Sequence, residues 1–317
     1  MRCFRALILL FVLAASHQLH AEDETAGDKT SGGLPGISPL VIFVPPTVLD
    51  ALKTFLRPNE SLDSFDDYAR AGNYRDLTDY LLLRRALALG GNRLPIHIEP
   101  WIDVSYDRLV LRLRAGQAAV FSNGIWREDF PETDSQLRVS SPLMEFGCLE
   151  AGLYMSPDNP HLHTTKTLAD VRKLTAVSST QWRPDWDALH QLGLAGVYDN
   201  VYWESMVKMV RGQRVDFMLS GFSRLPDLSY QAMGITLVPV QGLKIKLAGS
   251  RGWVVSLVNP QGETAHQVIE KGLAILREQG VITRAYRGAG AINDQVADWK
   301  VLNPDLVAPQ SIRYGAP

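Results

Sequence analysis

Apolar residues recur along the chain in two patterns, short runs rich in β-branched residues and longer stretches with helical spacing. The run 40–44 (Leu-Val-Ile-Phe-Val) is apolar throughout and two prolines follow it, which predicts a strand covered on both faces. Across residues 76–89 apolar residues recur at steps of three and four before a Gly-Gly pair, which predicts a helix. Residues 95–99 predict the next strand. Strands that alternate with helices favour the α/β class.

One phrase occurs twice, about a hundred residues apart. A tyrosine stands ten positions before a Gly-Gln pair in both copies, at Tyr106 and at Tyr202, and the residues between have helical spacing. An apolar run follows each pair, at 118–121 and at 215–219. A helix that ends at a glycine and leads directly into a strand is a step of a parallel sheet. Two copies are too few for a solenoid, so we predict two α/β lobes that contain one copy each.

The remaining segments predict a second lobe inserted into the first. Within the second lobe, 174–177 and 234–240 read as strands and 185–192 as a helix. Further on, 253–258 reads as a strand and 264–279 as a long amphipathic helix that ends at a glycine. We expect this last helix to return and complete the first lobe.

The N-terminus predicts export. Arg2 and Arg5 precede the apolar run 6–15, and Ala21 provides a small residue for cleavage, so residues 1–21 read as a secretory signal peptide. The apolar run is shorter than the ~20 residues of a membrane-spanning helix. The polar stretch 22–38, rich in Gly, Ser and Thr, predicts a flexible leader.

Charge excludes one class of partner. The 317 residues include 32 Lys and Arg and 34 Asp and Glu, and loss of the signal peptide would change the net charge from −2 to −4. Such a chain has no basic field to attract nucleic acid or anionic lipid, so we expect no nucleic-acid partner.

Cysteine and histidine usage excludes a second class of site. Cys148 would be the single cysteine of the exported chain, which excludes an internal disulfide, and we predict a buried, inert thiol there. The pair His161 and His163 has no third ligand nearby in the sequence. We therefore predict neither a metal site nor a cofactor.

Several phrases together resemble the periplasmic solute-binding proteins of ABC importers, in particular family 3, which mostly binds amino acids and other small polar solutes. The resemblance covers residues 40–286. Its phrases, in chain order, are Leu113-Arg-Ala-Gly-Gln117 leading to Arg127 and Ser141-Pro142, Leu168-Ala-Asp-Val-Arg-Lys-Leu174 leading to Ser178-Ser-Thr180, Met209-Val-Arg-Gly-Gln-Arg-Val-Asp216, and the segment 273–286.

The resemblance implies the two-lobed type 2 periplasmic binding fold, with two hinge strands and a solute held between the lobes. Transferred to this chain, lobe 1 is 39–152 plus 243–317, and lobe 2 is 153–241. The implied location is the periplasm, and we expect a monomer that delivers its solute to an inner-membrane ABC permease or reports it to a sensor.

The carboxyl ends of the strands should line the cleft, because ligands of open α/β sheets bind there. The candidate anchor is Arg127, with Arg138 as its rival, because the family places an arginine after the glycine-to-strand step to grip a carboxylate. The remaining ligand-binding candidates are the turn residues Ser122, Asn123, Ser178, Ser179, Thr180, Ser220 and Gly221. The alternatives are that Arg127 pairs with a neighbouring acid and that the hydroxyl and amide groups cap turns or helices.

One departure from the family points to the solute's charge. Amino-acid binders of this family carry an Asp for the ammonium group after the strand that ends here at Leu219, but this chain has Ser220-Gly-Phe-Ser223. A buried ammonium group without a partner would be costly, so we predict an anionic solute. The tryptophans at 101, 126, 182, 186, 203 and 253 could supply one or two stacking surfaces, and most should be core.

These residues predict a binding protein and not an enzyme. The expected cleft turns supply hydroxyls, an amide and an arginine, and the Gly-x-Ser-x-Gly, His-Glu-x-x-His and Gly-Lys-Ser/Thr phosphate-loop motifs are absent from the sequence. Two alternatives stay open. One is a dehydratase-like periplasmic enzyme on the same scaffold, and the other is a ligand-free accessory or sensory module.

Overall fold

The computed structural model describes residues 38–72, 74–102 and 105–305. The predicted signal peptide and the predicted leader up to residue 37 lie outside the described residues. The chain divides into two units, Met1–Gly36 and Ile37–Pro317. The fold described below is that of the second unit. In the described ranges, no helix has the length and apolar character that a membrane crossing requires.

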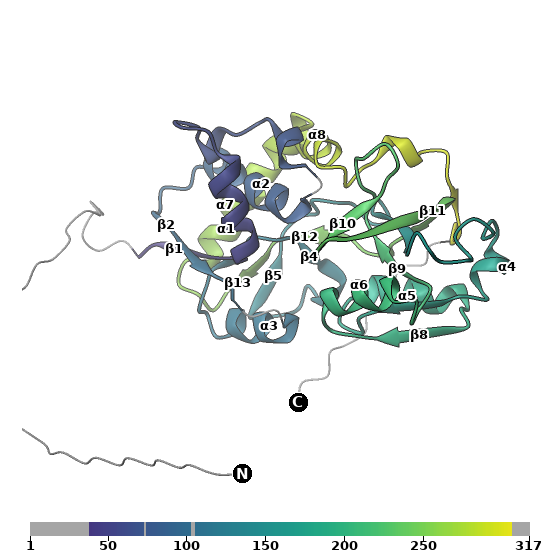
Figure 1. The fold of residues 1–317 in the computed structure, drawn as a ribbon. Coiled ribbons are helices and arrows are strands. Elements are labelled where there is room, and N and C mark those ends of the chain that lie inside the picture. The colour runs from purple at the N-terminus through teal and green to yellow at the C-terminus, as the bar shows by residue number, and fades with distance from the viewer. Residues whose placement is uncertain (1–37, 73, 103–104, 306–317) are drawn as a thin grey trace, which may run out of the picture. The chain divides into compact units, whose positions relative to one another are not determined.

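The first sheet is built around the apolar run at the start of the described chain. β1 (Leu40–Val44) runs parallel to the strands on either side of it, and β13 runs antiparallel to β3 and β5. The strand order is β2–β1–β3–β13–β5 (Figure 1). The bounds of the other strands are Ile96–Pro100 for β2, Val120–Phe121 for β3, Val254–Ser256 for β13 and Leu137–Val139 for β5.

Helices from both ends of the chain accompany this sheet. They are α1 (Pro46–Phe55), α2 (Arg75–Gly90), α3 (Tyr106–Arg114), α7 (Gly262–Glu278) and α8 (Val281–Gly288). The sequence analysis did not foresee α1 or α8. Pro46 occupies the first turn of α1, where a missing N–H costs nothing, and Gly280 adopts a φ of 65° between α7 and α8.

The second sheet is built from the middle of the chain. Its strand order is β10–β11–β6–β9–β7–β8, and β14 pairs with β11. The bounds are Tyr230–Ala232, Ile235–Lys246, Glu150–Met155, Phe217–Ser220, Thr175–Ser178, Gly196–Asp199 and, for β14, Lys300–Val301. The helices of this part are α4 (Leu168–Val171), α5 (Arg183–Leu192) and α6 (Trp203–Arg211). The predicted α/β class, with a second sheet inserted between segments of the first, is confirmed by this order.

The repeated phrase forms the same step in both sheets. α3 leads into β3, which runs parallel to β1, and α6 leads into β9, which runs parallel to β7. The residue in the left-handed conformation after each helix is Gly116 (φ 71°) in the first copy and Gln213 (φ 53°) in the second. The two copies are therefore one residue out of step, although their sequences align glycine with glycine.

The first part of the fold is the first sheet with its helices, and the second part is the second sheet with its helices. Strands β6 and β11 connect the two parts, and a buried ion pair joins these two strands. Lys244 of β11 is 4% exposed and lies 2.9 Å from Glu150 of β6. Its ammonium group also donates to the carbonyl of Val296 over 2.8 Å. β14 pairs in parallel with β11 and therefore belongs to the second sheet.

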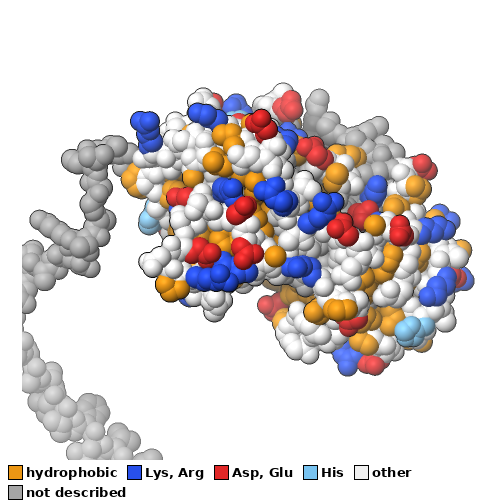
Figure 2. All heavy atoms as spheres, turned by 90° about the horizontal axis from the view of Figure 1, so that it is seen from above, with side chains coloured by type: hydrophobic (Ala, Val, Ile, Leu, Met, Phe, Trp, Pro, Cys, Tyr) orange, Lys and Arg blue, Asp and Glu red, His pale blue; other side chains and the backbone are white. Residues whose placement is uncertain are grey.

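The surface carries both signs of charge. On the face that Figure 2 shows, Lys and Arg side chains are interspersed with Asp and Glu. That mixture accords with the near balance of acidic and basic residues in the sequence.

Two glycines bring α2 and α7 into backbone contact. A Cβ added to Gly272 would lie 1.9 Å from the carbonyl oxygen of Ala86, and one added to Gly90 would lie 1.9 Å from that of Val268. Backbone atoms cannot move aside as the end of a side chain can. The two helices (Figure 1) therefore approach as closely as they do because both positions lack a side chain.

Gly272→Ala is expected to destabilise the fold by about 1–3 kcal/mol or more, because the added methyl group forces the helices apart. Urea unfolding followed by circular dichroism measures the change. Gly196→Ala in β8 is the matched control, since the nearest atom to its Cβ would be 3.4 Å away. Equal unfolding midpoints for the two variants would contradict the close approach.

Candidate functional site

A cavity of about 450 Å³ is lined by residues from both parts of the fold. We call this cavity the cleft. The first part contributes the start of α2, with Arg75 and Asp76, and the neighbouring side chains Trp126 and Arg251. The second part contributes residues before and within α5 and α6 and the turn after β9. The cleft therefore has a charged side and a side formed mainly by aromatic residues.

Arg251 is the most deeply buried cation of the cleft. It lies on the short ribbon of β12 (Arg251–Gly252) and β4 (Ile125–Trp126), is 7% exposed, and has its guanidinium carbon 5.3 Å from the ring centroid of Trp126. Its Nη2 donates to the carbonyl of Gly124. Its Nε is buried and has no hydrogen-bond partner among the described residues. One donor of a buried, charged side chain is thus uncommitted.

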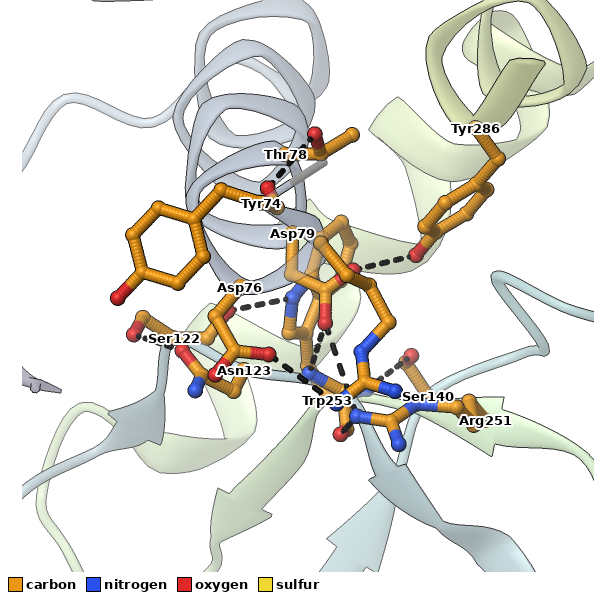
Figure 3. A network of polar contacts seen from close by, with 12 residues as sticks. Tyr74, Asp76, Thr78, Asp79, Ser122, Asn123, Ser140, Arg251, Trp253 and Tyr286 are labelled. Atoms are coloured by element: carbon orange, nitrogen blue, oxygen red, sulfur yellow. Dashed lines mark hydrogen bonds and ion pairs between the residues drawn. The ribbon is translucent and has the colours of Figure 1, made fainter. Parts of the chain in front are cut away.

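Asp79 of α2 provides the counter-charge to Arg251. Its carboxylate is fully buried, lies 3.7 Å from Nη2 of Arg251, and accepts hydrogen bonds from the hydroxyl of Tyr286 (2.6 Å) and the N–H of Gly124 (2.9 Å), as Figure 3 shows. Burial raises the pKa of Asp79, while Arg251, Arg75 and the Tyr286 hydrogen bond oppose that rise. Tyr286, Gly124 and Arg251, which lie far apart in the sequence, therefore converge on one carboxylate.

A tryptophan and two serines form a second set of hydrogen bonds beside this network. The indole N–H of Trp253, a fully buried side chain, donates to the carbonyl of Ser122 over 3.0 Å, and its backbone N–H donates to Oγ of Ser140 over 3.0 Å (Figure 3). The Ser122 hydroxyl donates to the side-chain oxygen of Asn123 over 2.9 Å. The candidates Ser122 and Asn123 are thus buried in this support and do not line the cleft.

Arg75 and Asp76 form the more accessible part of the charged side. Their side chains are 43% and 31% exposed and pair over 3.3 Å. Burial disfavours the charge of Arg75, but Asp76 and Asp79 prevail and raise its pKa. Arg75 therefore remains a cation beside Arg251.

Asp185 faces these cations from the first turn of α5. Burial raises its pKa to about 6, and Arg75 and Arg251 act through space in the opposite direction. No basic group of the described residues lies within ion-pair distance of its carboxylate. Asp185 is thus a carboxyl group without a direct partner, in a cavity that also holds two arginines.

Two of the candidate ligand residues line the cleft, Ser220 at the end of β9 and Gly221 directly after it. The turn Ser178–Thr180 does not line it, because its groups bond within the second part of the fold. The Ser179 hydroxyl accepts from the N–H of Gln181 (3.2 Å), and the N–H of Thr180 donates to Asp199 (2.9 Å). This bonding matches the alternative in which these groups support a turn.

Arg127 and Arg138 line a separate cavity of about 370 Å³, together with Ser141, His266 and Glu270. Neither arginine lines the cleft. Trp126 and Arg127 are neighbours in the chain but line different cavities. The arginines that line the cleft are Arg75 and Arg251.

The sequence analysis missed Arg75, Asp76, Asp185 and Arg251. Asp185 follows the candidate turn by a few residues, and that spacing was the one available signal.

The prediction for Cys148 was wrong in its burial, because the thiol is free and exposed beside Gly147, whose φ of 70° forms a turn. In the part of the chain that the structure describes, no group of three or more His, Cys, Asp or Glu residues could hold a metal ion.

A comparison with protein-family models found no match, and a comparison with curated protein sequences found none either. Among solved structures, the chain is similar to the amino acid ABC transporter substrate-binding protein AbpA from Streptococcus pneumoniae bound to L-arginine. The identity is 12%, over 81% of this chain and 96% of that chain, with a TM-score of 0.47.

Two further solved structures are similar. One is the GluR0 ligand-binding core from Nostoc punctiforme in complex with L-glutamate, with 14% identity over 78% of this chain and 97% of that chain and a TM-score of 0.41. The other is an ancestral amino acid-binding protein, a precursor of cyclohexadienyl dehydratase, with 18% identity over 67% and 84% and a TM-score of 0.44. At identities this low, none of their ligands transfers to this chain.

Asp79→Asn is expected to lower the free energy of unfolding by about 3–5 kcal/mol, because it leaves the buried guanidinium of Arg251 without a counter-charge. Thermal and urea unfolding at pH 7 measure the loss. Asp76→Asn at the accessible pair is the control and should cost less than about 1 kcal/mol. A loss for Asp79→Asn as small as that of the control would show that Arg251 does not depend on Asp79.

Proposed function

We propose that this chain is a periplasmic solute-binding protein that takes a small anionic solute into the cleft and passes it to an inner-membrane ABC permease or a sensor. The observation that carries the proposal is Arg251, a cation more than nine-tenths buried that lines the cleft and whose Nε has no hydrogen-bond partner among the described residues. A guanidinium that lines a cavity can donate charge-assisted hydrogen bonds to a carboxylate, and these are roughly twice as strong as bonds between neutral groups.

Arg75 supports the same reading. Its accessible guanidinium lines the cleft beside Arg251, so an anion held by Arg251 would also lie in its field. The counter-charges Asp76 and Asp79 lie on α2, as Arg75 does, and stabilise both arginines before a solute arrives. A prepared cation site loses little free energy to reorganisation when the anion binds.

The connections between the two sheets suit a protein that encloses its solute. Residues of the cleft come from segments on both sides of β6 and β11, and Glu150 of β6 lines the cleft itself while pairing with Lys244. A solute that contacts both sides would favour the arrangement in which they lie close together, by as much as its differential affinity allows.

One observation favours the alternative of an enzyme on the same scaffold. Asp185 has a pKa of about 6 in the cleft, which lies in the range suited to proton transfer near neutral pH. Product analysis after incubation with carboxylic acids tests this alternative. Turnover that Asp185→Asn abolishes while binding persists would establish catalysis. A cleft that binds no acid at all would favour the accessory or sensory module.

Arg75→Gln and Arg251→Lys are each expected to weaken carboxylate binding at least tenfold, about 1.4 kcal/mol, since each removes a charge-assisted contact. Arg127→Gln and Arg138→Gln are matched controls, because these residues line the other cavity. A thermal-shift screen of carboxylates identifies the solute, and calorimetry gives the affinities. Loss of binding in Arg127→Gln with retention in Arg75→Gln and Arg251→Lys would place the anion elsewhere.

Lower pH is expected to strengthen anion binding, because the ionised carboxylate of Asp185 competes for the two arginines and protonation near its pKa of about 6 removes that competitor. Affinity should therefore rise between pH 7.5 and pH 5, by about tenfold if the anion shifts this pKa by one unit. Asp185→Asn should bind as tightly at pH 7.5 as the unchanged protein does at pH 5. Weaker binding in this variant would mean that Asp185 contacts a cationic group of the solute.

A further inference from the structure

We propose that the solute is a flat aromatic or heteroaromatic monocarboxylate, whose ring stacks on Trp182 while its carboxylate binds Arg251 and Arg75. This inference rests on the proposed function and names the chemical class of its solute. It comes from the side of the cleft opposite the arginines, which the anion site itself does not explain.

The second part of the fold presents mainly carbon to the cleft. Most of its large lining side chains are aromatic, namely Trp182, Trp203, Phe222 and Tyr230, and Leu219 lies with them. Its polar side chains there are Glu150, Asp185, Ser220 and Ser223. Glu150 already pairs with Lys244 over 2.9 Å, and the Ser223 hydroxyl accepts from the N–H of Leu225 over 3.0 Å. A solute rich in hydroxyl groups would leave several of them unpaired in such a site, which is costly. A flat apolar body avoids that cost.

Most aromatic rings of the cleft already contact other rings or cations. Trp203 meets Tyr230 edge-on at 6.0 Å, and Phe222 meets Trp299 edge-on at 5.3 Å. Trp126 lies against Arg251, and its ring also packs closely on Gly249, because a Cβ added there would lie 2.7 Å from the ring atom Cε3 of Trp126. Trp182 is half-buried, and no ring or cation among the described residues is in stacking contact with it. Trp182 packs in part against buried side chains of the second sheet, and it also lines the cleft.

The position of Trp182 places a stacked ring near the anion site. Trp182 occupies the N-cap position of α5, and Asp185 follows it by three residues, so both lie on the same side of the first turn and line the cleft. Arg75 and Arg251 act electrostatically on Asp185. A ring on Trp182 thus lies beside the carboxyl group that the two arginines face, as a short aromatic acid requires.

Charge limits the solute to one carboxylate. The cleft and its support hold two arginines, Arg75 and Arg251, against the three aspartates Asp76, Asp79 and Asp185, while the fourth carboxylate, Glu150, pairs with Lys244. The arginines already have counter-charges in Asp76 and Asp79. A second carboxylate on the solute would find no further cation on the aromatic side, where Asp185 would repel it.

The test compares benzoate with cyclohexanecarboxylate, which has the same charge and similar size without a π-system. Calorimetry at pH 5.5 should show benzoate binding about three- to tenfold more tightly, which is the usual contribution of an aromatic pair. Trp182→Leu should abolish this preference, and Trp182→Phe should retain most of it. Trp186→Leu on the same helix is the control, because Trp186 contacts His190 (4.6 Å between centroids) and does not line the cleft.

Equal affinities for the two acids, or a preference that survives Trp182→Leu, would overturn the aromatic class and leave the anion site intact. Tighter binding of L-glutamate or L-arginine than of benzoate would overturn it as well. If neither acid bound at millimolar concentration and no other carboxylate shifted the melting temperature, the proposed function would fall together with this inference.

Discussion

The buried pair of Asp79 and Arg251 is the constraint on which the cleft depends. Removing two charges from water costs several kcal/mol for each ion, and their attraction compensates only when the remaining hydrogen-bonding groups are satisfied. Tyr286 and Gly124 supply donors to the carboxylate, and Gly124 also accepts from the arginine. Helices α2 and α8 and the β4–β12 ribbon must therefore meet at one point. That arrangement leaves Nε of Arg251 without a hydrogen-bond partner among the described residues.

Hydrophobic periodicity predicted the larger part of the fold. The α/β class, the inserted second sheet and the helix-to-strand steps all follow from apolar spacing and from glycines after helices. Helices α1 and α8 were not predicted, because the local signals at their starts have two meanings. Pro46 reads equally as the end of a strand or the first turn of a helix, and Gly280 both ends α7 and precedes α8. The ion pair between Lys244 and Glu150 joins residues 94 positions apart, which no periodicity encodes.

The site was less predictable than the fold because its polar groups lie on segments that only tertiary packing brings together. Sequence reasoning favoured residues directly after strands, and of these Ser220 and Gly221 do line the cleft. Arg75 begins a helix, and Arg251 lies on a two-residue strand that has no pattern of its own. Trp126 and Arg127 are adjacent, so a sequence motif cannot separate them, yet Trp126 ends β4 and Arg127 begins a short 3-10 helix (Arg127–Asp129). One lines the cleft and the other a different cavity.

The one-residue offset between the two copies of the repeated phrase bears on how they can be exchanged. Each residue turns an α-helix by about 100°, so a transplant that aligned glycine with glycine would rotate the apolar stripe of the helix away from its sheet. Gln213 also occupies a left-handed position that glycine fills at Gly116, at some conformational cost. The two copies therefore share a pattern of helix and strand but are not interchangeable. A chimera of them would have to be designed on an alignment of backbone conformations and not on the sequence alignment.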